Sequence, residues 1–350
     1  VEAEAPDAME IPAALPAADP APPEPPPATD ASPAPPPAPP AEPPMPAEAA
    51  ETAAEEAAPV EPPVEAASAP EGSEGDRQVA ALPPAPDPAL IESALVGPLP
   101  RIGPDGKEPW QAYARPFDAA DGRPRIAIVI TDLGQSGAAT ETAIQGLPGP
   151  VTLAFAPYAP RLQTWLPEAR AAGHETLLMV PMEPTSYPRN DPGPHTLLTS
   201  LSPAANHERL NWVLSQANGY VGVVNSMGSR LTTAPEALRP VLEALDSRGL
   251  MFLDSRTAAT SVAARVAGEI GLPHADNDRF IDDVASRDAI DRRLRELEAL
   301  AREQGYAVGM AYPYPVSFER LAAWIPTLEE KGFVLAPISA IAAAPQDHSG

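Results

Sequence analysis

Several short apolar runs of this sequence are followed directly by polar side chains that could do chemistry. Asp132, Glu183 and Asp254 each come within three residues of the end of such a run. A carboxylate in this position can act as a general base, or it can simply accept backbone hydrogen bonds. Groups that could hold a polar ligand follow the same or other runs: Asn225, Ser226, Ser229, Arg230, Arg256, His195 and Tyr312. Together these side chains predict a polar catalytic or binding site.

The apolar runs are typical of buried parallel strands, because they are nearly continuous rather than alternating. They are residues 126–130, 151–155, 176–180, 221–224, 251–253, 307–310 and 334–335. Apolar residues at helical spacing separate most of them, as at Leu238, Val241, Leu242 and Leu245. This alternation predicts an α/β fold, a deformed barrel of seven or eight strand–helix units, with a doubly wound open sheet as the alternative. In such a barrel the carboxyl ends of the strands form one rim, so the polar residues would meet there.

Some of these candidates also have a structural interpretation. Glu183 could anchor a loop, and Asp254 is close enough to Arg256 in sequence to form an ion pair. His195 lies in a long loop of residues 185–201 that is rich in Pro, Gly and Asp, and it could order that loop by hydrogen bonding. The sequence leaves these alternatives open.

The first part of the chain differs from the rest in composition. Residues 1–76 contain no Lys or Arg and carry −17 of the formal net charge of −25, and the first aromatic residue is Trp110. Such a segment cannot bury enough apolar surface to offset the entropy lost on ordering. We therefore predict a disordered acidic linker over residues 1–86, an extended arm over 87–124, a barrel over 125–342 and a disordered tail over 343–350.

Composition also excludes several classes of protein. The sequence has no basic patch for nucleic acid, no apolar run of about 18 residues that could span a membrane, and no Cys for disulfides or thiolate metal sites. Because the chain begins with Val1 rather than Met, we expect that an upstream signal peptide or membrane anchor has been removed. The Pro-rich linker would then be a spacer that holds the barrel away from an anchor, outside the cytoplasm.

Six motifs give this sequence a family resemblance. They are IAIVITDLG, VTLAFAP, GHETLLMVPMEP, VNSMGSR, LMFLDSRT and the PYP that follows residues 307–310. In this order they resemble the divergent polysaccharide deacetylase family, whose members have the NodB-like deformed barrel of carbohydrate esterases. The resemblance covers roughly residues 90–342.

The resemblance implies a metal-dependent hydrolase whose metal ligands are largely replaced here. Active members end the first strand with an Asp–Asp pair, in which one Asp is the base and the other binds metal, and two His complete the site. In this chain the pair reads Thr131–Asp132, and Ser226 and Tyr312 stand where better-preserved relatives have His. A hydroxyl is a poor zinc ligand beside imidazole. Asp132 would be the remnant of the metal site, so we expect no tightly bound cofactor.

A weak, oxygen-rich site for zinc or another divalent metal is the alternative. It would combine Asp132 with Glu183 and with His195, if the loop of residues 185–201 folds over the rim.

Three functions follow from the resemblance and the altered motifs. The domain could remove acyl groups from an envelope polysaccharide, bind a peptidoglycan-type glycan without hydrolysing it, or act as an interaction module for an envelope protein. Asn225 and Ser229 could bind sugar hydroxyls or cap the following helix, and Tyr312 with Tyr314 could stack on a sugar ring or pack internally. A glycan binder should show a rim groove with exposed aromatic side chains, whereas a scaffold should show a large apolar surface patch.

Overall fold

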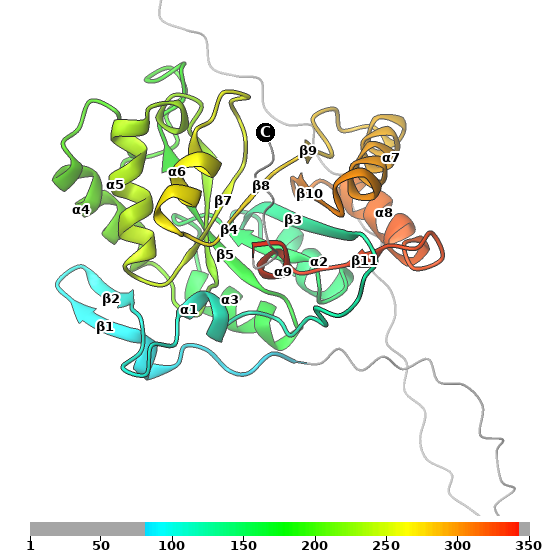
Figure 1. Ribbon diagram of the computed structural model, residues 1–350, viewed down its shortest axis with the longest axis horizontal. Coiled ribbons are helices and arrows are strands. Elements are labelled where there is room, and N and C mark those ends of the chain that lie inside the picture. The colour runs from blue at the N-terminus through cyan, green and yellow to red at the C-terminus, as the bar shows by residue number, and fades with distance from the viewer. Residues whose placement is uncertain (1–80, 343–350) are drawn as a thin grey trace, which may run out of the picture. The chain divides into compact units, whose positions relative to one another are not determined.

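The computed structural model describes residues 81–342 (Figure 1). The predicted disorder of residues 1–80 and 343–350 lies outside the described residues. Within residues 81–342, no helix is both long enough and apolar enough to cross a membrane.

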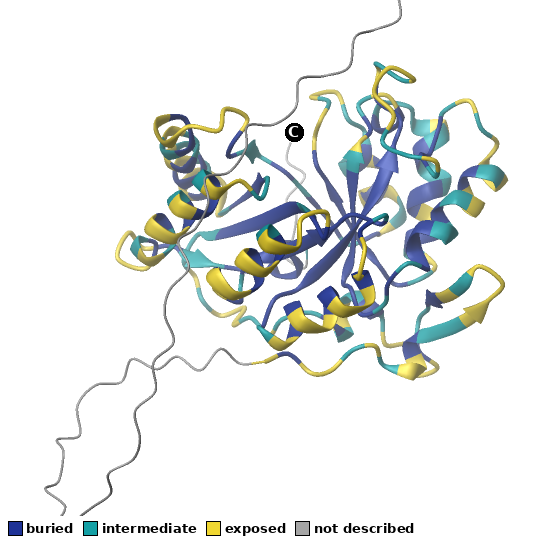
Figure 2. Cartoon of the chain, turned by 180° about the vertical axis from the view of Figure 1, so that it is seen from behind, coloured by how far each residue is buried: buried dark blue, intermediate teal, exposed yellow. Residues whose placement is uncertain are grey.

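A curled sheet forms the centre of this part of the chain. Its nine strands within the described residues are all parallel. They are β3 (Arg125–Leu133), β4 (Thr152–Phe155), β5 (Thr176–Met182), β6 (Gly222–Met227), β7 (Met251–Asp254), β8 (His274–Asp276), β9 (Arg279–Phe280), β10 (Tyr306–Ala311) and β11 (Val334–Leu335). The strands are buried along most of their length, as Figure 2 shows, because side chains cover both faces of the sheet.

The strand order explains why the sheet is a deformed barrel. Neighbours follow the order β8-β7-β6-β5-β4-β3-β10-β9, so the chain winds in one direction from β3 to β8 and then returns to the other side of β3. A doubly wound sheet would instead reverse direction near its middle. The predicted barrel is therefore confirmed. It remains open between β8 and β9, which are joined by two residues but do not pair, and β11 pairs with the first two residues of β3.

Helices follow most of the strands and turn their polar faces to solvent (Figure 2). They are α2 (Gly137–Gly146), α3 (Leu162–Ala171), α4 (Pro203–Leu214), α5 (Pro235–Asp246), α6 (Ala263–Ile270), α7 (Arg287–Gln304), α8 (Pro315–Trp324) and α9 (Ile338–Ala342), with short 3₁₀ turns at Leu231–Thr233 and Ile325–Thr327. In α5 the predicted stripe of Leu238, Val241, Leu242 and Leu245 is buried, which confirms the helical spacing.

An arm ahead of the barrel packs across the amino ends of the strands. It contains a 3₁₀ turn (Pro88–Leu90), a hairpin of β1 (Ile91–Ala94) and β2 (Gly97–Pro100), and the short α1 (Pro109–Ala112). We predicted that the linker extends to residue 86, but Leu82 is buried and its N–H donates to the carbonyl of Arg170. The Arg170 guanidinium also donates to the carbonyls of Pro83 and Tyr113. Contact with the barrel therefore begins earlier than predicted.

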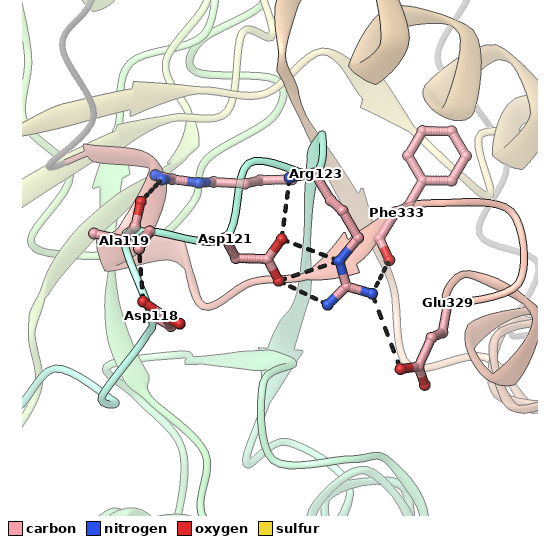
Figure 3. Close-up of polar contacts among 8 residues, drawn as sticks. Asp118, Ala119, Asp121, Arg123, Glu329 and Phe333 are labelled. Atoms are coloured by element: carbon pink, nitrogen blue, oxygen red, sulfur yellow. Dashed lines mark hydrogen bonds and ion pairs between the residues drawn. The ribbon is translucent and has the colours of Figure 1, made fainter.

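The end of the arm is tied to the segment that leads into β11 (Figure 3). The Arg123 guanidinium lies 2.7 Å from an Asp121 carboxylate oxygen, 3.5 Å from the Phe333 carbonyl and 4.0 Å from Glu329. These groups are open to solvent, which screens the charges, so the ion pairs are weak. Their role is to set the direction in which the chain enters β3.

Candidate functional site

Unusual backbone conformations gather at the carboxyl ends of the strands. Among the described residues, the non-glycine residues with positive φ are Asp132, Arg161, Met227 and Arg256, with φ between 50° and 60°. Each lies at the end of a strand or in the loop that follows one. A non-glycine residue in this region costs on the order of 1–3 kcal/mol, and such residues cluster at functional sites. The backbone thus points to the rim where the sequence placed the polar residues.

A bulge at the end of β3 turns Asp132 toward the rim. The pairing register with β4 shifts between Ile130 and Leu133, and Asp132 takes a left-handed conformation with φ of 55°. Gly134 follows with φ of 91°, and a Cβ there would lie 2.4 Å from that of Ala159. The chain therefore turns sharply after Asp132, and only glycine fits at the second position of this turn.

Asp132 lines a pocket of about 390 Å³ at this rim. The walls come from the start of α2 and from the segment after β10: Gln135, Ser136, Ala139, Thr140, Tyr312, Pro313 and Tyr314. Amide, hydroxyl and carboxylate groups on one wall face phenol rings on the other. This is the combination of a few polar groups with an aromatic surface that small-molecule and sugar sites use.

The carboxyl of Asp132 has few partners in the described structure. Its closest hydrogen bond comes from Thr131 Oγ1 at 3.5 Å, and no cation pairs with it. Burial raises the pKa of Asp132, because the charged form loses water without gaining a strong donor. The backbone N–H of Asp132 points instead at Met179 Sδ, 3.2 Å away inside the barrel. Asp132 is therefore a partly desolvated acceptor at the pocket wall.

The two tyrosines of the pocket wall form a row of rings with Phe280, which lies behind Tyr312 and outside the pocket lining. Tyr312 lies nearly parallel to Phe280, with centroids 6.0 Å apart, and Tyr314 lies 5.7 Å from Tyr312 at a tilt of 40°. Tyr314 is 44% exposed. Burial and the charges of Asp132 and Asp282 raise the pKa of Tyr312, so its phenol stays protonated. We call Phe280, Tyr312 and Tyr314 the aromatic ledge.

Asp282 fixes the position of Tyr312 in the ledge. Its carboxylate Oδ2 accepts the Tyr312 N–H at 2.9 Å and the hydroxyl of Ser317 in α8, while Oδ1 is buried without a hydrogen bond. Burial raises the pKa of Asp282 to about 6, although the bonds from Ser317 and Tyr312 act in the opposite direction. Sequence analysis gave no sign that Asp282 fixes the ledge.

Glu183, Ser229 and Arg230 form a second cluster that joins two loops. The Glu183 carboxylate is buried and accepts from the N–H and the hydroxyl of Thr199, at 2.6 and 2.7 Å, and Arg230 Nη1 lies 3.2 Å away. Ser229 Oγ accepts the N–H of Thr185 at 3.1 Å. These contacts hold the loop of residues 185–201 against the loop after β6. The Glu183, Ser229 and Arg230 side chains, which the sequence suggested for catalysis or binding, are therefore engaged with protein groups.

Asn225 and Asp254 are bound to nearby backbone. Asn225 donates to the carbonyl of Met227 at 2.7 Å and accepts from the N–H of Ser255 at 2.7 Å. Asp254 is buried and accepts the N–H of Arg256 at 2.8 Å. The ion pair that the sequence suggested between the Asp254 and Arg256 side chains is not formed. The carboxylate accepts the backbone N–H of Arg256 instead. Asn225 thus joins the ends of β6 and β7, and Asp254 holds the turn that follows β7.

His195 and Ser226 complete the predicted set. The His195 ring stacks on Trp212 of α4, with centroids 3.6 Å apart, and the backbone N–H of His195 donates to the Tyr158 hydroxyl. Burial lowers the pKa of His195, which keeps the ring neutral. Ser226 is half-buried on β6, opposite Pro181 of β5.

Comparison with known proteins agrees with this fold. A sequence profile described as divergent polysaccharide deacetylase matches residues 128–342. The chain belongs to the divergent polysaccharide deacetylase family. The resemblance that the sequence motifs indicated is therefore confirmed.

Relatives in this family come from several bacteria. An uncharacterized protein of Haemophilus influenzae is 31% identical over 206 residues, which are 59% of this chain and 72% of that protein. Uncharacterized protein YibQ of Escherichia coli K12 is 28% identical over 193 residues, 55% of this chain and 60% of YibQ. The crystal structure of an uncharacterized protein from Agrobacterium tumefaciens C58 is 38% identical, with a TM-score of 0.68, over 70% of this chain and 99% of that one.

The residues at the rim do not fit the metal site that polysaccharide deacetylases use. Within residues 81–342, no three His, Asp or Glu side chains come together in an arrangement that could hold a metal ion. Around Asp132, the pocket offers an amide, two hydroxyls and phenols. Glu183 and His195, the alternative partners for a weak site, are engaged with Thr199 and Trp212. Zinc prefers imidazole, thiolate and carboxylate ligands, so this donor set does not match it.

Proposed function

We propose that this domain binds an envelope glycan in the rim pocket, between Asp132 and the aromatic ledge. The observation that carries the proposal is the half-exposed ring of Tyr314 in the same pocket as the Asp132 carboxylate. Within the described residues, that carboxylate has only a long hydrogen bond, of 3.5 Å from Thr131 Oγ1. A sugar ring has an apolar face that suits an aromatic surface and an edge of hydroxyls that suits a carboxylate or amide. The pocket, with a volume of about 390 Å³, supplies both the aromatic surface and the polar groups.

Binding is better supported than metal-dependent deacetylation. The family is named for deacetylation of polysaccharides, which supports a polysaccharide ligand and a place in the cell envelope, outside the cytoplasm. The donor set around Asp132 does not match a zinc site, so we assign no hydrolytic step to it. In this proposal the domain uses the rim pocket to recognise a glycan and does not hydrolyse it.

The exposed apolar side chains support a glycan ligand over a protein scaffold. Among the described residues, the large apolar side chains that are exposed are Leu95, Val96, Met227, Val284 and Tyr314. Leu95 and Val96 lie at the turn of the β1–β2 hairpin in the arm, whereas Met227 ends β6 and Tyr314 follows β10 at the rim. Scaffold surfaces are usually larger and contiguous.

The substitution Tyr314→Ala tests the ledge. We expect it to weaken binding of chitotetraose, measured by isothermal titration calorimetry on the full chain, by about 1 kcal/mol or roughly fivefold in Kd. Because Tyr314 is exposed, the melting temperature should stay within about 1 °C. Leu95→Ala is the control, since it removes a fully exposed apolar side chain from the arm, away from the rim. Unchanged affinity in Tyr314→Ala, or a wild-type chain that binds no glycan, would contradict the proposal.

The substitution Asp132→Asn tests the carboxylate. Asn keeps the shape and tolerates the left-handed backbone, but it removes a charge that burial disfavours. We therefore expect an equal or higher melting temperature together with a roughly tenfold weaker Kd for the same glycan, because charge-assisted hydrogen bonds to the sugar are lost. A fall of several degrees in melting temperature would instead make Asp132 a structural residue.

A further inference from the structure

Arg256 has a strained backbone conformation, and no contact within the described residues explains why an arginine side chain stands there. Its φ is 50°, in the left-handed region that disfavours any residue with a Cβ. The side chain is exposed, and within the described residues the guanidinium has no hydrogen bond or ion pair. Gly or Asn would adopt this backbone at lower cost, so the fold alone does not call for Arg.

Two other arginines at the rim have side-chain contacts within the described residues. Arg161 has the same backbone strain, with φ of 60°, but its guanidinium lies over the Trp165 ring at 4.5 Å. Arg230 lies 3.2 Å from the buried carboxylate of Glu183. Both guanidinium groups therefore have a contact partner, whereas that of Arg256 has no hydrogen bond, ion pair or ring contact within residues 81–342.

The two carboxylates that feel the charge of Arg256 accept hydrogen bonds from backbone N–H groups. Asp254 uses its carboxylate for the backbone N–H of Arg256, and Asp278 uses its own for the N–H of Val308 at 2.9 Å. Burial raises the pKa of both carboxyls, and the positive charge of Arg256 opposes this effect. The cation is thus held close to two anions, yet its hydrogen-bond donors remain available.

Arg256 and the aromatic ledge lie on the two sides of the opening in the barrel. Asn277 donates to the carbonyl of Asp254 at the end of β7, and Asp278 donates to the carbonyl of Val308 in β10. These two residues are the connection between β8 and β9, which Figure 1 shows beside β7 and β10 respectively. Arg256 follows β7 and Tyr312 follows β10, so a ligand on the ledge that extends across this connection reaches Arg256.

We propose that Arg256 binds a carboxylate on the glycan, so that the rim selects an acidic polysaccharide over a neutral one. This inference rests on the proposed function of the rim as a glycan site. A guanidinium offers paired donors in a plane that matches a carboxylate, and a single Arg balances a single negative charge. Selection by Arg256 also accounts for a strained, solvent-facing cation in a chain whose formal net charge is −25.

Two tetrasaccharides that differ mainly in carboxylates test the inference. Chitotetraose contains only N-acetylglucosamine, and the second probe alternates N-acetylglucosamine with N-acetylmuramic acid, which adds a lactyl carboxylate to every other sugar. We expect the wild-type chain to bind the acidic probe about tenfold more tightly, by calorimetry in 0.15 M salt. In Arg256→Asn this ratio should fall to about one, and the melting temperature should rise by about 2 °C because Asn tolerates the backbone.

Arg161→Asn is the matched control, because it removes the same charge from the same rim at an equally strained position. It should keep the tenfold ratio. The inference is overturned if the wild type binds both probes equally, if the ratio survives in Arg256→Asn, or if Arg161→Asn abolishes it as well; in these cases the glycan site itself still stands. If the wild-type chain binds neither probe, the proposed function fails and this inference fails with it.

Discussion

In the Asp282→Asn variant, stability should lose the part of its pH dependence between about pH 4 and pH 6 that comes from this one buried carboxyl. Burial raises the pKa of Asp282 in the folded chain to about 6, from an ordinary value of 3.8. A folded-state pKa above the unfolded value means that the folded chain keeps its proton where the unfolded chain has lost it. This contribution to stability is fully present below pH 3.8 and is lost as the pH rises through 6. Two pKa units correspond to about 3 kcal/mol, which Asn removes because it has no proton to lose.

The measurement is the free energy of unfolding in urea at pH 4, 5, 6 and 7 for the wild type and the variant. The quantity of interest is the difference between the two chains, because Asp132, Glu175, Asp254 and Asp278 have raised pKa values as well and contribute equally to both. Relative to the wild type, the variant should gain about 2–3 kcal/mol from pH 4 to pH 7.

The neighbouring residue provides a control of opposite sign. Hydrogen bonds from Arg293 lower the pKa of Asp283, so its contribution to stability is present above the unfolded pKa and is lost as the pH falls through the folded value. Asp283→Asn should therefore lose stability relative to the wild type as the pH rises, and by a small amount, because the pair is exposed. A difference that does not change with pH in Asp282→Asn would show that Asp282 is not the buried, protonatable group that supports Tyr312.

The rim could be predicted from sequence because parallel strands impose it. Once apolar runs of five or so residues alternate with helical spacing, the residue after each run lies at one edge of the sheet whatever the loops do. Asp132 and Tyr312 were placed correctly in this way, although they are 180 residues apart. The short strands β8 (His274–Asp276) and β9 (Arg279–Phe280) escaped prediction because charged and polar residues interrupt them, so neither forms an apolar run.

The roles of individual polar residues could not be predicted, because they depend on how loops from different strands meet. Glu183 finds Thr199 and Arg230 only because the loops after β5 and β6 lie side by side. Asp254 turns to a backbone N–H, and not to the Arg256 side chain, because the chain bends at Arg256. Phe280 joins the ledge through its parallel pairing with β10. Spacing along the chain holds no information on these partners.

The second large effect is expected at Glu183, which the sequence offered as a catalytic carboxylate. We expect Glu183→Ala to lower the free energy of unfolding by about 3 kcal/mol. The carboxylate accepts two short hydrogen bonds from Thr199, and bonds to a charged, buried acceptor contribute about 1.5–3 kcal/mol each before relaxation. The Arg230 contact adds little, because the Arg230 side chain is 56% exposed.

Glu183→Gln separates this structural role from a catalytic one. Gln retains an oxygen that can accept from Thr199 and loses only the charge, so it should cost about 1 kcal/mol and leave glycan affinity within twofold. Hydrogen exchange adds a local readout: the amides of Thr199 and Arg230 should exchange faster in Glu183→Ala than in the wild type, because the loop of residues 185–201 is no longer held to the loop after β6. Glu208→Ala, on the exposed face of α4, is the control for loss of a carboxylate. If Glu183→Ala were as stable as this control, the buried contacts with Thr199 would not hold the loop, and a role for Glu183 in ligand binding would have to be considered again.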